Sequence, residues 1–144
     1  MIHVTPDAAA PRAAFDGLPW CLRALLACWV NIVLLPSRRV LDRSPHALAN
    51  VLEHDTAGRV YVTDLEVAGA LVAAGLRLDH RGFPFARPRR RPQPGTWGLG
   101  AHQGDADERL AFEALLRAVE GRVRVLPRCP AGVRREVLGL EVLA

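Results

Sequence analysis

The sequence contains no lysine, so all nineteen of its basic residues are arginine. Arginine binds carboxylates and phosphates through a planar, permanently charged fork of hydrogen-bond donors. The same bias, with abundant alanine, glycine, proline and valine, is typical of a GC-rich genome, such as that of a bacterium, a phage or a large DNA virus. Without lysine, the chain cannot form a nucleotide site of the P-loop type, in which a lysine contacts the β- or γ-phosphate.

Cysteine is scarce as well. The three cysteines, Cys21, Cys28 and Cys129, are odd in number and irregularly spaced, which is not the pattern of a disulfide framework. On a helix, Cys21 and Cys28 share one face with their Cα atoms about 10 Å apart, too far for a disulfide bond. We therefore expect free thiols and a cytoplasmic protein, or a host intracellular one if the source is viral.

A long hydrophobic run is also missing. The first fifteen residues hold no apolar segment of the kind found in signal peptides. The most apolar stretch, residues 18–35, is interrupted by Arg23 and Asn31 and is shorter than the roughly 20 residues that a membrane span needs. We expect a buried helix here and no membrane partner.

Motifs for catalysis, metal binding and cofactor binding are absent too. Only two serines exist, and neither lies in a GxSxG motif. The histidines and cysteines have no CxxC, HxxxH or HExxH spacing. The remaining catalytic candidates are an acid–base pair within Asp79-His80-Arg81 and the thiol of Cys129. We therefore expect no cofactor and no metal, and the sequence favours a function other than catalysis.

Composition and patterning predict one small α+β domain. The chain has 144 residues, of which half are hydrophobic and 6% aromatic, so its core is built mainly from leucine, valine and alanine. Capping residues and stop signals predict about four helices, over residues 19–34, 44–55, 63–74 and 105–121. Short antiparallel strands are predicted over residues 59–63, 76–80, 83–87 and 122–126, and residues 133–143 fit either a strand or a helix.

Changes in composition divide the chain into four parts. We expect a flexible N-terminal tail over residues 1–16 and an α+β core over residues 17–88. Residues 89–104, rich in arginine, proline and glycine, form a linker or a long loop. Residues 105–144 form a helix and one or more strands that pack on the core, since so short a segment rarely folds by itself.

The order of elements in the core resembles a winged-helix arrangement. A helix is followed by a strand, a second helix, a strand, a turn and a strand, and in winged-helix folds a helix beside a two-stranded wing contacts nucleic acid. The sequence departs from this pattern because one helix is missing between the strand at Val60 and the helix at Asp64. The resemblance concerns architecture, and a fold does not fix a function.

The densest polar feature is the segment from Arg77 to Arg91, where six arginines and one acid, Asp79, give a charge of +5. Closely spaced arginines contact phosphates through bidentate hydrogen bonds and release counterions; the alternative is a solvated basic loop. We predict a nucleic-acid-binding or regulatory module whose partner is nucleic acid or an acidic protein surface. The candidate contacts are Arg77, Arg81, Arg87, Arg89, Arg90 and Arg91, with Trp97 as a base-stacking group and Arg38 and Arg39 assisting.

A second hypothesis is a protein-interaction module, such as an oligomeric assembly factor or a phage or viral inhibitor. The helix over residues 19–34 is apolar around most of its circumference, which is typical of a helix at the centre of a core or at an oligomer interface. This hypothesis predicts a homo-oligomer or a complex with a protein partner. The interface residues would be Trp20, Leu25, Trp29 and Ile32.

Overall fold

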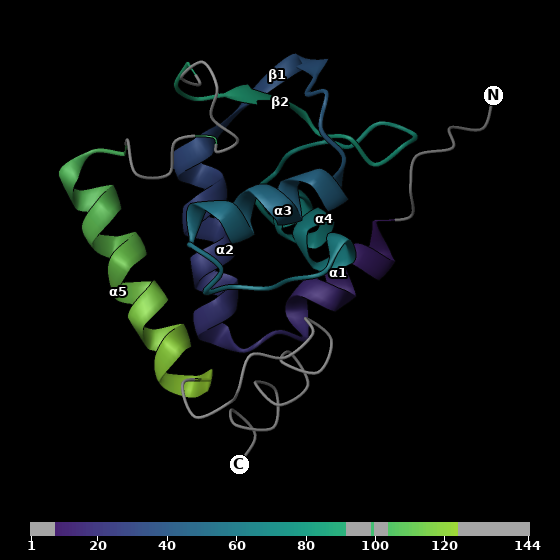
Figure 1. Cartoon of the computed structure of the whole chain (residues 1–144). Helices are drawn as coiled ribbons and strands as arrows, with labels where there is room; N and C mark the ends of the chain where they lie inside the picture. The colour runs from purple at the N-terminus through teal and green to yellow at the C-terminus, as the bar shows by residue number, and fades with distance from the viewer. Residues whose placement is uncertain (1–7, 92–98, 100–103, 124–144) are drawn as a thin grey trace.

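The computed structural model describes residues 8–91, 99 and 104–123. These residues form five helices and one two-stranded antiparallel sheet, which is the small α+β fold expected from the sequence. The sheet lies at the top of the view above the packed helices, and α5 lies along one side (Figure 1). The elements in chain order are α1 (Ala9–Asp16), α2 (Trp20–Val33), β1 (Leu34–Val40), α3 (Pro45–Asp55), α4 (Asp64–Ala73), β2 (Phe85–Pro88) and α5 (Ala106–Val123).

Helix α2 supplies much of the core. Leu25, Trp29 and Ile32 are buried, as expected for an apolar helix, and the indole Nε1 of Trp29 donates a hydrogen bond to Oδ2 of Asp55 over 3.0 Å. Trp20, in the first turn of the same helix, is not part of the core. Its side chain is 54% exposed, because the residues that follow it supply the buried face of this first turn. No helix among the described residues is long and apolar enough to cross a membrane.

The first turns of α3 and α4 are capped as the sequence predicts. Oγ of Ser44 accepts a hydrogen bond from the backbone N–H of Ala47 over 3.1 Å. Thr63 and Glu66 form a capping box, in which each side chain accepts a hydrogen bond from the backbone N–H of the other, over 3.2 and 2.8 Å. After α4 the chain reverses at Gly75, whose φ of +87° favours glycine.

Helix α1 forms where the sequence analysis expected a flexible tail, and that expectation is wrong for residues 9–16. Pro11 and Phe15 are buried against α4. The contact is close because α4 carries Gly69 at this point: a Cβ there would lie 2.0 Å from the carbonyl oxygen of Pro11 and 2.6 Å from Cβ of Phe15. The alanine-rich α1 is therefore held in place by its contact with α4, which the sequence of α1 alone does not indicate.

The strand predicted over residues 59–63 does not form. Val60 and Val62 are buried as expected, but the segment has no strand partner among the described residues. The N–H of Val60 donates instead to Oγ1 of Thr56 over 3.3 Å, and the N–H of Arg59 donates to the carbonyl oxygen of Thr56 over 3.1 Å. The last turn of α3 thus satisfies backbone groups that a strand would have satisfied through a ladder.

The sheet joins two segments that are far apart in the sequence. Strand β1 forms mainly in residues for which no strand was predicted, and it pairs with β2 so that Leu34 lies opposite Pro88 and Leu35 opposite Arg87. The resemblance to a winged helix is not confirmed. The strand at Val60 is missing, and β2 pairs with a strand that precedes α3.

Helix α5 packs on α2. The spacing of apolar residues in its sequence predicts a buried face made of Leu110, Ala111, Ala114, Leu115 and Ala118, but the contact is centred on a different face. Its buried residues are Phe112, Leu116 and Val119, because the large Phe112 side chain removes more apolar surface from water than the alanines of the competing face. The helix also continues to Val123, past the end predicted at Gly121. Of the predicted face, Leu115 and Ala118 pack against the core, whereas Ala111 and Ala114 are exposed and Leu110 is 65% exposed.

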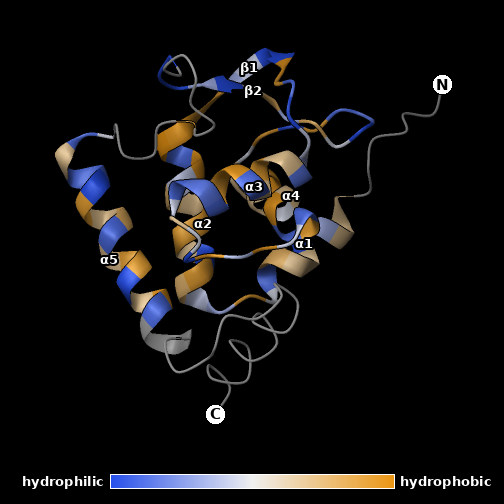
Figure 2. Ribbon diagram, viewed as in Figure 1, coloured by the Kyte–Doolittle hydropathy of each residue, from blue (hydrophilic) through white to orange (hydrophobic). Residues whose placement is uncertain are grey.

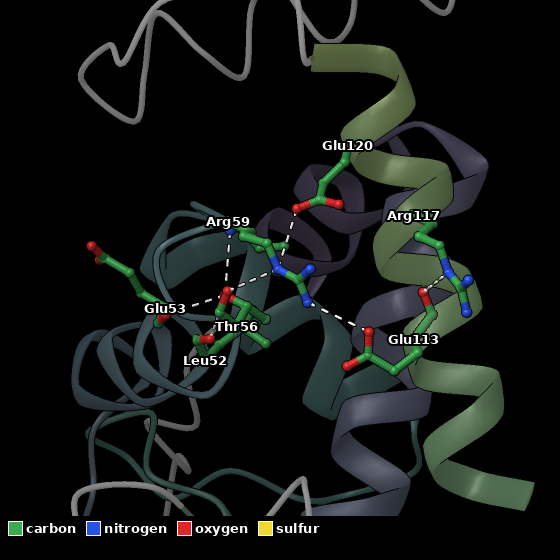
Figure 3. Close-up of polar contacts among 8 residues, drawn as sticks. Leu52, Glu53, Thr56, Arg59, Glu113, Arg117 and Glu120 are labelled. Atoms are coloured by element: carbon green, nitrogen blue, oxygen red, sulfur yellow. Dashed lines mark hydrogen bonds and ion pairs between the residues drawn. The ribbon is translucent and has the colours of Figure 1, made fainter.

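Arg59 ties α5 to the end of α3. Its Nε donates to the carbonyl oxygen of Thr56 and lies 3.2 Å from a carboxylate oxygen of Glu120, while Nη2 lies 3.6 Å from a carboxylate oxygen of Glu113 (Figure 3). Arg117 on the same helix bonds only the carbonyl oxygen of Glu113 among the residues drawn. The strand predicted over residues 122–126 is wrong at its start, because residues 122 and 123 belong to α5. The rest of that strand and residues 133–143 lie outside the described residues.

Candidate nucleic-acid interface

The segment that carries the arginines has an inner and an outer face. From Phe83 to Arg87 the side chains alternate, with Pro84 and Ala86 buried and Phe83, Phe85 and Arg87 at or near the surface. This alternation is the period-2 pattern of an extended chain over a core. The outer face of β2 and of the two residues before it therefore presents two aromatic rings and one arginine in a row; we call this surface the outer face of the sheet.

This segment has a neighbour on each side. On one side Leu78 bridges Pro84, the N–H of Asp79 donates to the carbonyl oxygen of Phe83, and the N–H of Phe85 donates to that of Arg77, both over 2.8 Å. On the other side β2 pairs with β1, and the N–H of Leu41 donates to the carbonyl oxygen of Pro84 over 2.8 Å. Proline within a strand predicts an edge position, but Pro84 has a neighbour on both sides. The antiparallel strands predicted over residues 76–80 and 83–87 contact each other only over this short bridge.

A bulge in β1 places Arg38 and Arg39. Pro36 lies opposite Ala86 and Val40 opposite Phe85, so three residues of β1 are inserted between two consecutive residues of β2. The N–H of Arg39 donates to Oγ of Ser37 over 3.1 Å within this bulge. Bulges redirect side chains from the regular pleat, and both arginines are exposed.

Four of the predicted arginine contacts are exposed and unpaired within the described part of the chain. Arg38, Arg39, Arg87 and Arg91 form no ion pair there. Three of them lie on β1 or β2, where the ribbon is largely hydrophilic (Figure 2). The sheet therefore gathers positive charge from two distant parts of the sequence, through a strand pairing that the sequence analysis did not predict.

Arg89 and Arg90 are instead engaged inside the molecule. Nη1 of Arg89 donates to Oε2 of Glu108 and, over 3.1 Å, to the carbonyl oxygen of Asn31. Nη2 of Arg90 lies 3.6 Å from Oε1 of Glu108. The N–H of Arg89 also donates to the carbonyl oxygen of Val33 over 2.8 Å. These two arginines join β2 to α2 and α5 and are not exposed phosphate contacts in this arrangement.

Arg77 and Arg81 lie over aromatic rings. Cζ of Arg81 is 4.1 Å from the centroid of the Phe83 ring, and Cζ of Arg77 is 5.0 Å from that of Phe85. Arg81 is also paired with Asp79 through Nε and Nη2, over 3.1 and 3.0 Å. Sequence reasoning missed Phe83 and Phe85 as site residues, although their alternation with Pro84 places them beside Arg87 on the outer face.

The carboxylate of Asp79 organises the turn. Oδ1 accepts hydrogen bonds from the backbone N–H groups of Arg81 and Phe83, over 2.8 and 2.9 Å. Burial by itself raises the pKa of Asp79, but these two amides and the Arg81 guanidinium lower it below its ordinary value. The candidate acid–base pair at this position is therefore an ionised turn carboxylate whose oxygens are already occupied.

The other candidates from the sequence do not form a site. Leu25, Trp29 and Ile32, proposed as an oligomer interface, are covered by residues of the same chain, and only Trp20 of that set is exposed. Burial, and secondly the charge of Glu108, raises the pKa of the Cys28 thiol, which makes it a poor nucleophile.

Across residues 8–91, 99 and 104–123, no cluster of three histidine, cysteine, aspartate or glutamate side chains is placed to hold a metal ion. Trp97 and Cys129 lie outside these residues, so their predicted roles stay predictions. In comparisons with known proteins, no family model, curated protein or solved structure matches the chain.

Proposed function

We propose that the protein binds nucleic acid through the outer face of its sheet, with Arg38, Arg39 and Arg87 as phosphate contacts. The observation that carries the proposal is that these side chains are exposed on one two-stranded sheet and make no ion pair with another described residue. A guanidinium that has no internal partner can give its full hydrogen-bonding fork to a phosphate.

The shape of the sheet suits such a partner. A two-stranded antiparallel ribbon is narrow enough to enter the major groove of DNA or to lie along a single strand. The arginines come from both strands, so they would contact phosphates on a track across the ribbon and not at one point. The net charge of +4 adds a general attraction to polyanions.

Fluorescence anisotropy with labelled single- and double-stranded DNA and RNA, over a series of salt concentrations, tests the proposal. The variant is Arg38→Gln with Arg87→Gln, one arginine from each strand. The control is Arg12→Gln with Arg117→Gln, which removes the same charge from α1 and α5. We expect affinity at low salt to fall about tenfold in the variant, and the slope of log affinity against log salt to fall by about 1.4 to 1.8, the value for two lost phosphate contacts.

Equal losses in the variant and the control would mean that net charge and not the sheet determines binding. If the unmodified protein binds none of the four nucleic acids at low salt, the proposal is wrong. In that case an acidic protein surface becomes the ligand to test against the same arginines.

A further inference from the structure

We infer that the outer face of the sheet takes single-stranded nucleic acid, with a base stacked on the guanidinium of Arg81. The inference rests on the proposed function and names the class of its ligand. It begins from a difference between arginines: Arg38, Arg39 and Arg87 have no ion pair among the described residues, whereas the charge of Arg81 is already balanced.

Arg81 is held from two directions. Asp79 accepts hydrogen bonds from Nε and Nη2 along one edge of the guanidinium, and the ring of Phe83 lies 4.1 Å below Cζ. The carboxylate occupies two of the five N–H donors of the guanidinium and balances its charge, so Arg81 is a weaker phosphate contact than an unpaired arginine. The side chain nevertheless remains 51% exposed. Because the Phe83 ring covers one face of the guanidinium, we infer that the opposite face is available to a flat ligand. Arginine planes of this kind are surfaces on which unpaired bases stack.

Arg77 and Phe85 repeat the arrangement beside it, with Cζ of Arg77 at 5.0 Å from the ring centroid. Phe83 and Phe85 are two residues apart on an extended segment, so their Cα atoms are separated by about 6.6 Å. Bases in a duplex follow one another at about 3.4 Å along each strand. Two consecutive bases that occupied both platforms would have to be unstacked from each other, which a single strand allows and a duplex does not.

The exposed arginines complete the site. Arg87 follows Phe85 on the same face of the segment, and Arg38 and Arg39 lie in the bulge between the partners of Phe85 and Ala86. Phosphate contacts therefore border the stacking platforms on the side of β1. A strand that passed over this face would place its bases on the arginine–phenylalanine pairs and its backbone against the unpaired arginines.

The test separates contacts to bases from contacts to phosphates. Anisotropy is measured with a thymidine dodecamer, with an abasic dodecamer that has the same phosphates, and with a duplex of the same length. The variant is Arg81→Lys, which keeps the charge and removes the plane, and the matched control is Arg12→Lys on α1. Circular dichroism and the unfolding midpoint confirm that each variant is folded. A second variant, Phe83→Leu, removes the ring below Arg81 and keeps all charges.

We expect the unmodified protein to bind the thymidine dodecamer about tenfold more tightly than the abasic one, and Arg81→Lys and Phe83→Leu to remove most of that difference. Binding to the abasic strand should be unchanged in both variants and in the control. Equal affinity for the abasic and thymidine strands, or equal affinity for single strand and duplex, would overturn the inference while salt-dependent binding through Arg38 and Arg87 would still support the proposed function. Absence of binding to every probe would remove both.

Discussion

At the scale of single residues, Asp79 controls the position of Arg81. Its side chain accepts two backbone hydrogen bonds and pairs with the guanidinium, and it is only 10% exposed. Loss of these contacts would release the turn that holds Arg81 over Phe83. We expect Asp79→Ala to lower the free energy of unfolding by about 1–2 kcal/mol at neutral pH, the range for a few hydrogen bonds in a partly exposed site.

The same carboxylate predicts a pH dependence. Because the pKa of Asp79 is lowered in the folded protein, the ionised form contributes stability that is fully present above the unfolded pKa of about 4 and is lost as the pH falls through the lower folded value. The difference in unfolding free energy between the unmodified protein and Asp79→Ala should be constant from pH 7 to about 5 and should shrink below about 4. Urea unfolding at several pH values measures it, and a difference that does not change with pH would contradict this account.

Residue identity does not reveal which arginines are available. Within Arg87, Arg89, Arg90 and Arg91 the sequence offers four equivalent guanidinium groups, and we predicted all of them as phosphate contacts. The structure divides them because Glu108, far along the chain, lies beside two of the four. Such a pairing depends on how α5 docks, so no property of the local segment indicates it.

At the scale of elements, the sequence predicted the starts of α3, α4 and α5 correctly, because the capping signals are local. The caps at Ser44, at Thr63 with Glu66, and at Asp105 lie within one turn of the groups they satisfy, so the sequence shows them directly. The pairing of β1 with β2 is long-range, and nothing near Pro36 indicates it. We therefore predicted the arginines of the outer face but not the pairing of β1 with β2 that brings them together.

The close contact between α1 and α4 predicts the effect of a substitution at Gly69. Gly69→Ala would raise the helix propensity of α4 by about 1 kcal/mol, but the new Cβ would meet the carbonyl oxygen of Pro11 at 2.0 Å. Backbone atoms cannot yield as a side chain does, so α1 must move away. We expect a net loss of about 1–3 kcal/mol and faster hydrogen exchange across residues 9–16.

Gly17→Ala provides the control, because its Cβ would have ordinary contacts at 3.4 Å and its φ of −78° suits any residue. That variant should be neutral or slightly more stable. If both glycine variants leave exchange in α1 unchanged, the close approach of the two helices is not what holds α1.

At the scale of the whole molecule, α5 engages Arg89 and Arg90 through Glu108, so we expect it to compete for them with the proposed ligand. Glu108 contacts both guanidinium groups at the N-terminal end of α5, while Arg59 holds Glu113 and Glu120 nearer its other end. Nη1 of Arg90 is buried without a hydrogen-bond partner among the described residues. A phosphate that reached Arg89 and Arg90 would take the place of the Glu108 carboxylate as their anionic partner.

This competition predicts two effects of opposite sign for Glu108→Gln. Stability should fall, because the neutral amide cannot balance two partly buried guanidinium groups and their charge is left uncompensated. Affinity for single-stranded nucleic acid at low salt should rise, on the order of three- to tenfold, because two more arginines become available to phosphate and one negative charge is removed. Glu113→Gln is the matched control, since it removes the same charge from α5 but contacts Arg59 instead. Anisotropy and thermal unfolding on both variants separate the cases: equal gains in affinity would reflect net charge, whereas a gain confined to Glu108→Gln would show that α5 withholds Arg89 and Arg90 from the ligand.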